Sequence, residues 1–451
     1  MALAAVFFLY VLVMRTYDVA TTFLMLGEQT RDWTIALGTI TDLPLIGAPS
    51  TAGGRGFGPA YYWLLWIGRV TIGPFMDNLP HAGGVVVALL QSIADTWLLL
   101  ALSRRVHWGL ALAMCLLIAS APFDVAISSV IWNPPVSAAL IKMATAMALT
   151  LRASSPRWHL AVTGMLAWMA VQAHLSAIFV AAPLLGAITI QSFVERSSSP
   201  RRTIVERASN LRRTIVERTL IIAAVILILQ IPFVIAIVSE PGGAVGPTSA
   251  IAGVINPQAV RPWFAYDSVT GITGNLLLPM PDGFSFAIAT LIVGAIVGVV
   301  YRRDPVILAT SIGGVIVATL LFTTSTRNYD SYWFLTLTTA LTLTYGMAIA
   351  AIPSKAAVKW SGIAILLWVA WRQPSRIADS TRFFEYPQYD TMVRASRELI
   401  QRAPVVRDIK VTFEVHPTMD RHFIYRILGG RIDGSALYTA VINGDGSIKL
   451  E

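Results

Sequence analysis

Two acidic side chains near the N-terminus, Glu28 and Asp32, have a spacing that could serve acid–base chemistry. They lie in the segment GEQTRDW at 27–33. Residues four apart share one face of a helix, so both carboxylates would point the same way. The alternative interpretation is that they are two solvated acids of a polar loop.

A second segment, GGRGFGPAYYW at 53–63, combines glycines with aromatic residues. Its glycines allow backbone shapes and close approaches that other residues forbid. The segment is not a dinucleotide-binding fingerprint, because no strand is expected before it and the glycine spacing differs. Tyr61, Tyr62 and Trp63 suit either a helix at the level of lipid headgroups or a surface that stacks on a sugar.

Other polar side chains occur at the ends of apolar segments. Asn133 lies in WNPP at 132–135, and His174 lies in QAHLS at 172–176. For Asn133 the alternative is a turn that starts a helix, and for His174 it is a satisfied histidine at a helix end. Four arginines are candidates for binding an anion: Arg55, Arg69, Arg261 and Arg327. Arg69 has a second interpretation, since a long basic side chain can snorkel to a membrane interface.

The elements that position these residues are predicted to be membrane helices and the outer loops between them. The chain has 451 residues, of which 55% are apolar and 13% are charged, and its mean hydropathy is +0.65. A soluble domain carries about 25% charged residues, so this chain has too little polar surface for an ordinary cytosolic enzyme. Its single cysteine, Cys115, lies in an apolar run and cannot close an internal disulfide. The net charge of +9 points to basic cytoplasmic loops, and no nucleic-acid partner is expected.

Apolar runs predict about eleven transmembrane helices, since about 20 helical residues cross the hydrocarbon core. The first run is short and would have to continue past Arg15 and Asp18, unless the true start lies upstream. The later spans are nearly free of ionisable groups, which argues against an ion-coupled carrier. The predicted runs are 2–26, 83–102, 109–121, 135–151, 158–172, 177–193, 219–238, 284–300, 305–322, 332–352 and 359–371.

The positive-inside rule sets the expected orientation. The segment 60–75 is apolar but contains Arg69, and we expect it to lie flat at the interface. With a cytoplasmic N-terminus, the basic loops then all fall inside. The loop 195–218 alone has seven arginines against three glutamates. The loops 15–82 and 239–283 and the tail 372–451 are then expected outside.

The tail differs in composition from the membrane part, 1–371. It contains twelve basic and ten acidic residues, and the segment NGDG at 443–446 is a strong hairpin signal. Helices at 388–402 and 419–428 and strands at 409–413, 438–442 and 447–450 are expected. The fold class predicted from the sequence is therefore an all-α polytopic membrane protein with interfacial helices in a long first outer loop and a small C-terminal α/β outer domain.

The order of these motifs resembles bacterial membrane glycosyltransferases of the GT-C superfamily. The branch most similar is family 39, with the protein O-mannosyltransferases and the lipid A aminoarabinose transferases. The matching segments are GEQTRDW, then GPAYYW, WNP and QAHLS, and they cover roughly residues 1–350. The resemblance implies a donor sugar on a polyprenyl phosphate, transfer on the outer face of the inner or plasma membrane, and inversion at the anomeric carbon.

The resemblance also implies roles for individual residues. Glu28 stands where the family usually has its catalytic aspartate, and Gln29 where many members have glutamate. Either Glu28 or Asp32 is then the base that takes the proton of the acceptor hydroxyl. Arg31, Tyr61 and Tyr62 match the family pattern, and Asn133 falls where some relatives carry a second acid. A divalent metal is left open, because Gln29 breaks the usual pair of acids.

The donor phosphate needs fixed cations where charge develops on the leaving group. Arginine suits phosphate through its bidentate fork, and Arg55, Arg69, Arg261 and Arg327 are the candidates for this role. The expected partners are the polyprenyl-phosphate donor, a lipid or glycan acceptor and membrane lipids. Two alternative functions are a transporter or lipid flippase, and a non-catalytic scaffold whose tail binds a partner.

Overall fold

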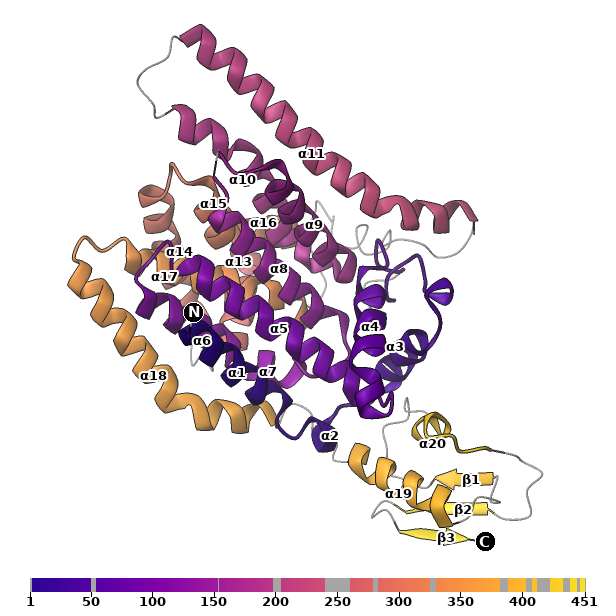
Figure 1. Cartoon of the computed structure of the whole chain (residues 1–451). Helices are drawn as coiled ribbons and strands as arrows, with labels where there is room; N and C mark the ends of the chain where they lie inside the picture. The colour runs from indigo at the N-terminus through magenta and orange to yellow at the C-terminus, as the bar shows by residue number, and fades with distance from the viewer. Residues whose placement is uncertain are drawn as a thin grey trace.

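The chain folds into a helical bundle with a small mixed segment at its C-terminal end (Figure 1). The structure is a computed structural model. It describes residues 2–49, 54–152, 154–197, 204–239, 260–278, 283–324, 330–381, 388–402, 408–411, 422–432, 439–443 and 447–450.

The first half of the chain supplies the helices around the candidate site. These are α1 (Ala2–Thr16), α2 (Val19–Thr22), α3 (Gly27–Leu37), η1 (Ile40–Asp42), α4 (Ala60–Thr71), η2 (Gly73–Met76), α5 (His81–Leu102), α6 (Trp108–Ala119), α7 (Pro122–Ile127), α8 (Asn133–Thr150) and α9 (Arg157–Ala173).

The second half adds the remaining helices and three strands. These are η3 (Leu175–Ala177), α10 (Ile178–Ser197), α11 (Ile204–Ser239), α13 (Pro262–Leu277), α14 (Gly283–Val300), α15 (Pro305–Leu308), η4 (Ala309–Gly313), α16 (Gly314–Phe322), η5 (Ser331–Phe334), α17 (Leu335–Ala350), α18 (Lys355–Thr381), α19 (Gln388–Arg402), β1 (Asp408–Val411), α20 (Phe423–Ile427), β2 (Thr439–Ile442) and β3 (Ile448–Leu450).

Six stretches in the described part of the chain are long and apolar enough to cross a membrane. They are Ala2–Thr22, His81–Leu102, Thr214–Ser239, Gly283–Val300, Pro305–Phe322 and Ser331–Ala350. Trp108–Ala119 and Leu175–Gln191 are shorter apolar helices. The polytopic all-α architecture predicted from the sequence is confirmed, whereas the count of eleven spans stays a prediction.

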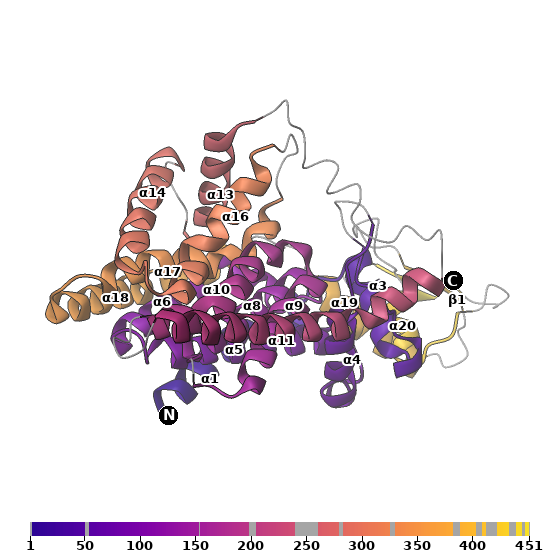
Figure 2. The ribbon, with the colours of Figure 1, turned by 90° about the horizontal axis from the view of Figure 1, so that it is seen from above.

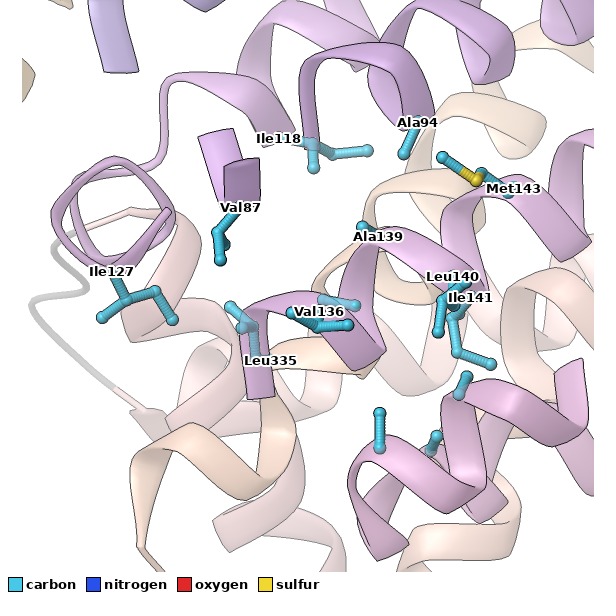
Figure 3. Packing of buried hydrophobic residues seen from close by; sticks show 14 of the residues in the cluster. Val87, Ala94, Ile118, Ile127, Val136, Ala139, Leu140, Ile141, Met143 and Leu335 are labelled. Carbon is cyan, nitrogen blue, oxygen red and sulfur yellow. The ribbon is translucent and has the colours of Figure 1, made fainter. Parts of the chain in front are cut away.

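Helix α8 lies at the centre of the bundle and packs against α5 and α9. Its residues from Pro134 to Leu149 are all buried, and many of them are alanines. Small side chains let helix backbones approach closely, which is how helices associate in a lipid environment. Figure 3 shows side chains of α5, α6, α7 and α17 gathered around α8. By contrast, the apolar part of α11 packs on α9 and α10 and is mostly exposed (Figure 1).

The predicted span 109–121 corresponds to α6, and a second short helix follows it after a break. Helix α6 ends at Ala119 and α7 begins at Pro122. Proline has no backbone N–H and fits the first turn of a helix, so Pro122 starts α7 but cannot continue α6. The N-terminal run is interrupted in a similar way, because Asp18 between α1 and α2 has a φ of 58°.

The expected outer loop 239–283 contains a helix that the sequence did not predict. Helix α13 packs against α14, α16 and α17. It lacks a long apolar run because Asp267 and several threonines and glycines interrupt it. Residues 240–259 of that loop lie outside the described residues.

The C-terminal elements agree closely with the predicted ones. Helix α19 spans the expected 388–402, and the three strands form a sheet in the order β1-β2-β3. Strand β2 pairs parallel with β1 and antiparallel with β3, and Ala440 lies opposite Leu450. This segment lies beside α2, at the end of the bundle that carries α3 and α4 (Figures 1 and 2).

Candidate active site

Helices α3 and α4 pack against each other and bring Asp32 to two tyrosines. The carboxylate of Asp32 accepts a hydrogen bond from Tyr61 Oη at 2.9 Å and one from Tyr62 Oη at 3.2 Å. It also accepts one from Nε of Arg31 at 2.7 Å. The structure therefore joins four residues of the sequence motifs in one hydrogen-bonded cluster.

This cluster is closed to solvent. Asp32 is 1% exposed and both tyrosines are 0% exposed. Burial, and after it the negative charge of Asp32, raises the pKa of each tyrosine, so both phenols stay protonated and donate to the carboxylate. A buried carboxylate with three donors fixes the angle between α3 and α4.

Glu28 lies one turn before Asp32 on α3 and is exposed. It makes no hydrogen bond or ion pair with any residue that the structure describes, and its negative charge acts on Arg31. The two acids that the sequence could not separate therefore have different environments. Asp32 is buried and hydrogen-bonded, whereas Glu28 is exposed and has no partner among the described residues.

Gln29 has a structural role that a glutamate could not fill. Its Oε1 accepts from the backbone N–H of Leu26 at 3.0 Å, and its Nε2 donates to the carbonyl of Ile131 at 3.2 Å. A carboxylate could accept the first bond but could not donate the second. The amide of Gln29 thus caps the start of α3 and links α3 by a hydrogen bond to the segment before α8.

The glycine-rich segment lies against the end of α9. A Cβ on Gly58 would come within 2.4 Å of the side chain of Gln172, and a Cβ on Gly47 within 2.8 Å of the backbone of Gly56. These close approaches require glycine. Arg55 donates from Nε to the carbonyl of Gly47 at 3.1 Å, and its positive charge acts on Tyr62.

Asn133 and His174 are brought together by a backbone contact. Nδ2 of Asn133 donates to the carbonyl of Ala173 at 2.9 Å. His174 bonds Oγ of Ser176 through Nδ1 at 2.7 Å, and its ring meets Tyr332 edge-on with centroids 5.8 Å apart. Burial lowers the pKa of His174 to about 4, so its imidazole is neutral at pH 7.

Arg69 and Arg261 form no hydrogen bond or ion pair with this cluster among the described residues. Arg69 lies in the last turn of α4, two turns beyond Tyr62, and its Nε is buried without a hydrogen-bond partner in the described structure. Arg261 is exposed at the start of α13. Arg327 lies outside the described residues.

The prediction that the spans are nearly free of ionisable groups is wrong. Arg15, Asp95, Asp124 and Lys142 are buried inside the bundle, where they form ion pairs with one another. Arg15 was noted only as an interruption of the first run, and Asp124 lies just beyond the predicted span 109–121. Asp95 and Lys142 are each a single charge in an otherwise apolar run. The available signal was their balance of sign, since two basic and two acidic residues come from four different helices.

No three His, Cys, Asp or Glu side chains gather to hold a metal ion in the part of the chain that the structure describes. The side chain of Gln29 is fully engaged and Asp32 already has three donors. These residues do not form a ligand set for a metal ion.

Comparisons with known proteins identify the fold. No family model matches this chain, and no curated protein matches its sequence. The structure of ArnT from Cupriavidus metallidurans bound to undecaprenyl phosphate is similar, with a TM-score of 0.56 and 14% identity, over 95% of this chain and 85% of that chain. ArnT, a lipid A aminoarabinose transferase, is a GT-C superfamily member. The chain has the GT-C fold.

Two further structures agree with this GT-C assignment. ArnT from the same organism in the apo state gives a TM-score of 0.54 at 12% identity, over 96% of this chain and 86% of that chain. The oligosaccharyltransferase of Archaeoglobus fulgidus in the apo form gives 0.50 at 12% identity, over 96% of this chain and 63% of that chain. At such identities the likeness concerns the GT-C fold alone.

Proposed function

We propose that this protein is a membrane glycosyltransferase that moves a sugar from a polyprenyl-phosphate donor to an acceptor hydroxyl, with inversion and with Glu28 as the general base. The observation that carries the proposal is the exposed carboxylate of Glu28 at the start of α3. It lies near Arg31, which the buried carboxylate of Asp32 holds in place. The GT-C fold supports a lipid-linked donor, since ArnT of the same fold was solved with undecaprenyl phosphate.

The environments of the two acids favour Glu28 over Asp32 as the base. A general base must come within hydrogen-bond reach of the proton it takes. Asp32 is buried and three donors already occupy its oxygens, whereas Glu28 is exposed. Asp32 is therefore assigned as a positioning residue.

The reaction uses the cations beside Glu28. The acceptor oxygen forms a bond to the anomeric carbon, the bond from that carbon to the phosphate oxygen breaks, and the hydroxyl proton passes to Glu28. The leaving polyprenyl phosphate gains negative charge, which fixed cations stabilise. Arg31 uses only Nε for Asp32, so its two terminal nitrogens are available to a phosphate oxygen. Arg55 supplies a second positive charge.

The proposed location of the reaction is the outer face of the inner or plasma membrane. The elements α3, α4 and α19 lie at one end of the bundle (Figures 1 and 2), and the positive-inside rule places that end outside. Cys115 is buried and is the single cysteine, so a cysteine at the exposed Asp42 is a clean reporter. A membrane-impermeant maleimide should label Asp42→Cys in whole cells. Labelling only after the membrane is opened would reverse the orientation.

Transfer is tested by mass spectrometry of envelope glycolipids and glycans from cells that lack the gene and carry a plasmid copy. The wild-type copy should restore one sugar-bearing species, Glu28→Gln should not, and Asp42→Asn should restore it fully. Asp42 is the control because it is an exposed acid of the same loop whose carboxylate bonds only Thr39 among the described residues. Full restoration by Glu28→Gln would overturn the assignment of the base.

The alternative of a transporter or flippase makes a different prediction in the same cells. A transporter would move a solute or lipid without forming a glycosidic bond, so no covalent product would depend on the gene. The buried charges in the spans remove one sequence argument against transport, but they are paired with each other.

A further inference from the structure

Four charged side chains from four helices meet in the interior of the bundle. Arg15 of α1 pairs with Asp95 of α5 at 2.7 Å and with Asp124 of α7, and Lys142 of α8 pairs with Asp95 at 2.9 Å and with Asp124 at 3.5 Å. All four side chains are at most 2% exposed. Two positive and two negative charges leave the cluster neutral.

The pair of Arg15 and Asp124 spans the interruption between α6 and α7. The Arg15 guanidinium donates to the carbonyl of Ala119, the last residue of α6, at 3.4 Å. It also bonds the carboxylate of Asp124 in the first turn of α7. A broken helix in a membrane leaves backbone groups that the protein itself must satisfy. One side chain of α1 therefore holds both sides of the break.

Helix α7 leads directly to the segment on which α3 rests. The chain runs from Ile127 through residues 128–132 to the start of α8, and the carbonyl of Ile131 accepts the hydrogen bond from Gln29. Ser129 packs closely against α5. A Cβ added to Gly84 of α5 would lie only 2.2 Å from the carbonyl oxygen of Ser129. The position of α7 thus sets the position of α3.

A second link runs from the same cluster to the start of α8. Lys142 donates to Oε1 of Gln91 at 2.9 Å, and Nε2 of Gln91 donates to the carbonyl of Pro135 at 2.7 Å. Asn133, two residues earlier, holds Ala173 next to His174.

We propose that the Arg15–Asp124 pair is a positioning device, which fixes the break between α6 and α7 and thereby places the start of α3, with Glu28, against residues 128–133. The inference rests on the proposed function for its kinetic readout but not for its structural one. Arg15 and Asp124 are buried in the interior of the bundle and act through α7, Ile131 and Gln29.

The test removes this pair as a unit and compares it with another Arg–Asp pair. Arg15→Met with Asp124→Asn leaves the Asp95–Lys142 pair in place, so no unpaired charge remains buried. The control is Arg105→Met with Asp304→Asn, an ion pair of 3.1 Å just after the C-terminal end of α5. Hydrogen exchange of the purified full-length protein in detergent is followed by mass spectrometry.

Exchange should rise by about tenfold in residues 128–133 and in α3 for the Arg15–Asp124 variant, and should stay at the wild-type level there for the control. In cell membranes, kcat for sugar transfer should fall by at least about tenfold while KM stays within about twofold, because misplacement of a reacting group lowers the chemical step. Unchanged exchange in both segments, or an equal rise in the control, would overturn the proposal.

The conservative variant Arg15→Lys covers the case in which the double variant fails to fold. Lysine keeps the charge but lacks the planar fork, so it cannot hold Ala119, Asp95 and Asp124 together. A smaller rise in exchange in the same two segments is expected, and no rise would overturn the proposal. If neither wild type nor variants transfer sugar while the exchange pattern holds, the positioning role stands and the proposed function fails.

Discussion

Removing the Asp32 carboxylate should loosen α3 from α4 by an amount that can be worked out from its hydrogen bonds. Asp32→Leu leaves the hydroxyls of Tyr61 and Tyr62 buried without an acceptor. An unsatisfied buried polar group costs about 1–3 kcal/mol, so the two hydroxyls together cost about 4 kcal/mol. Arg31 adds little, since its side chain is 36% exposed and can turn to water.

The cost should largely vanish when the hydroxyls are removed as well. Replacing all partners of a buried hydrogen bond by apolar groups of similar shape is nearly neutral. The triple variant Asp32→Leu, Tyr61→Phe and Tyr62→Phe should therefore lose only about 1 kcal/mol. Glu28→Gln, which removes an exposed charge with no partner among the described residues, should change the stability of α3 and α4 hardly at all.

Hydrogen exchange of the amides in α4 measures this local opening. A loss of about 4 kcal/mol corresponds to roughly thousandfold faster exchange, since each 1.4 kcal/mol is tenfold. The reasoning is refuted if Asp32→Leu exchanges at the wild-type rate. It is also refuted if the triple variant exchanges as fast as the single one.

Three further predictions concern other contacts of the site. Gln29→Glu should lower the stability of α3 by about 1–2 kcal/mol, because it leaves the carbonyl of Ile131 without its donor, whereas an unchanged melting temperature would contradict this. Gly84→Ala should destabilise the protein by about 3 kcal/mol or more, because the new Cβ would meet the backbone of Ser129. The control is Gly186→Ala, which has open space around it and should be neutral or stabilising in the same thermal melts. Burial lowers the pKa of His174 to about 4 in the folded protein, whereas the unfolded chain binds this proton at about pH 6.5. The free energy of unfolding should therefore fall as the pH drops from about 6.5 to about 4. His174→Gln should flatten that part of the plot of stability against pH.

The sequence predicted the helices well because apolar runs of membrane length have few alternative structures. The hairpin of β2 and β3 was predictable for a similar reason, since turn residues at 443–446 separate two short apolar segments. Helix α13 was missed because Asp267 and its neighbours lower the hydropathy of a helix that packs largely on other helices.

The site was predicted as a set of motifs but not as a geometry. The spacing of Glu28 and Asp32 placed both on one helix, yet their separate roles depend on which one α4 covers. Which acid is covered depends on how α3 packs against α4. The contacting residues are 29 and 30 positions apart, so no local sequence pattern predicts the contact. The buried ion pairs were hidden for the same reason, because Arg15 meets Asp124 only after α1 has packed against α5 and α7.

The seating of α19 on the start of the bundle has a consequence for how the protein is made. Oη of Tyr389 bonds Nδ1 of His81 at 2.7 Å, its ring meets Phe23 edge-on, and Arg397 pairs with Asp77 at 2.7 Å. His81 is synthesised 308 residues before Tyr389. The surface that α19 covers is therefore exposed during most of translation. A chain that ended before α19 would leave the side chains of Phe23, Asp77 and His81 without these contacts.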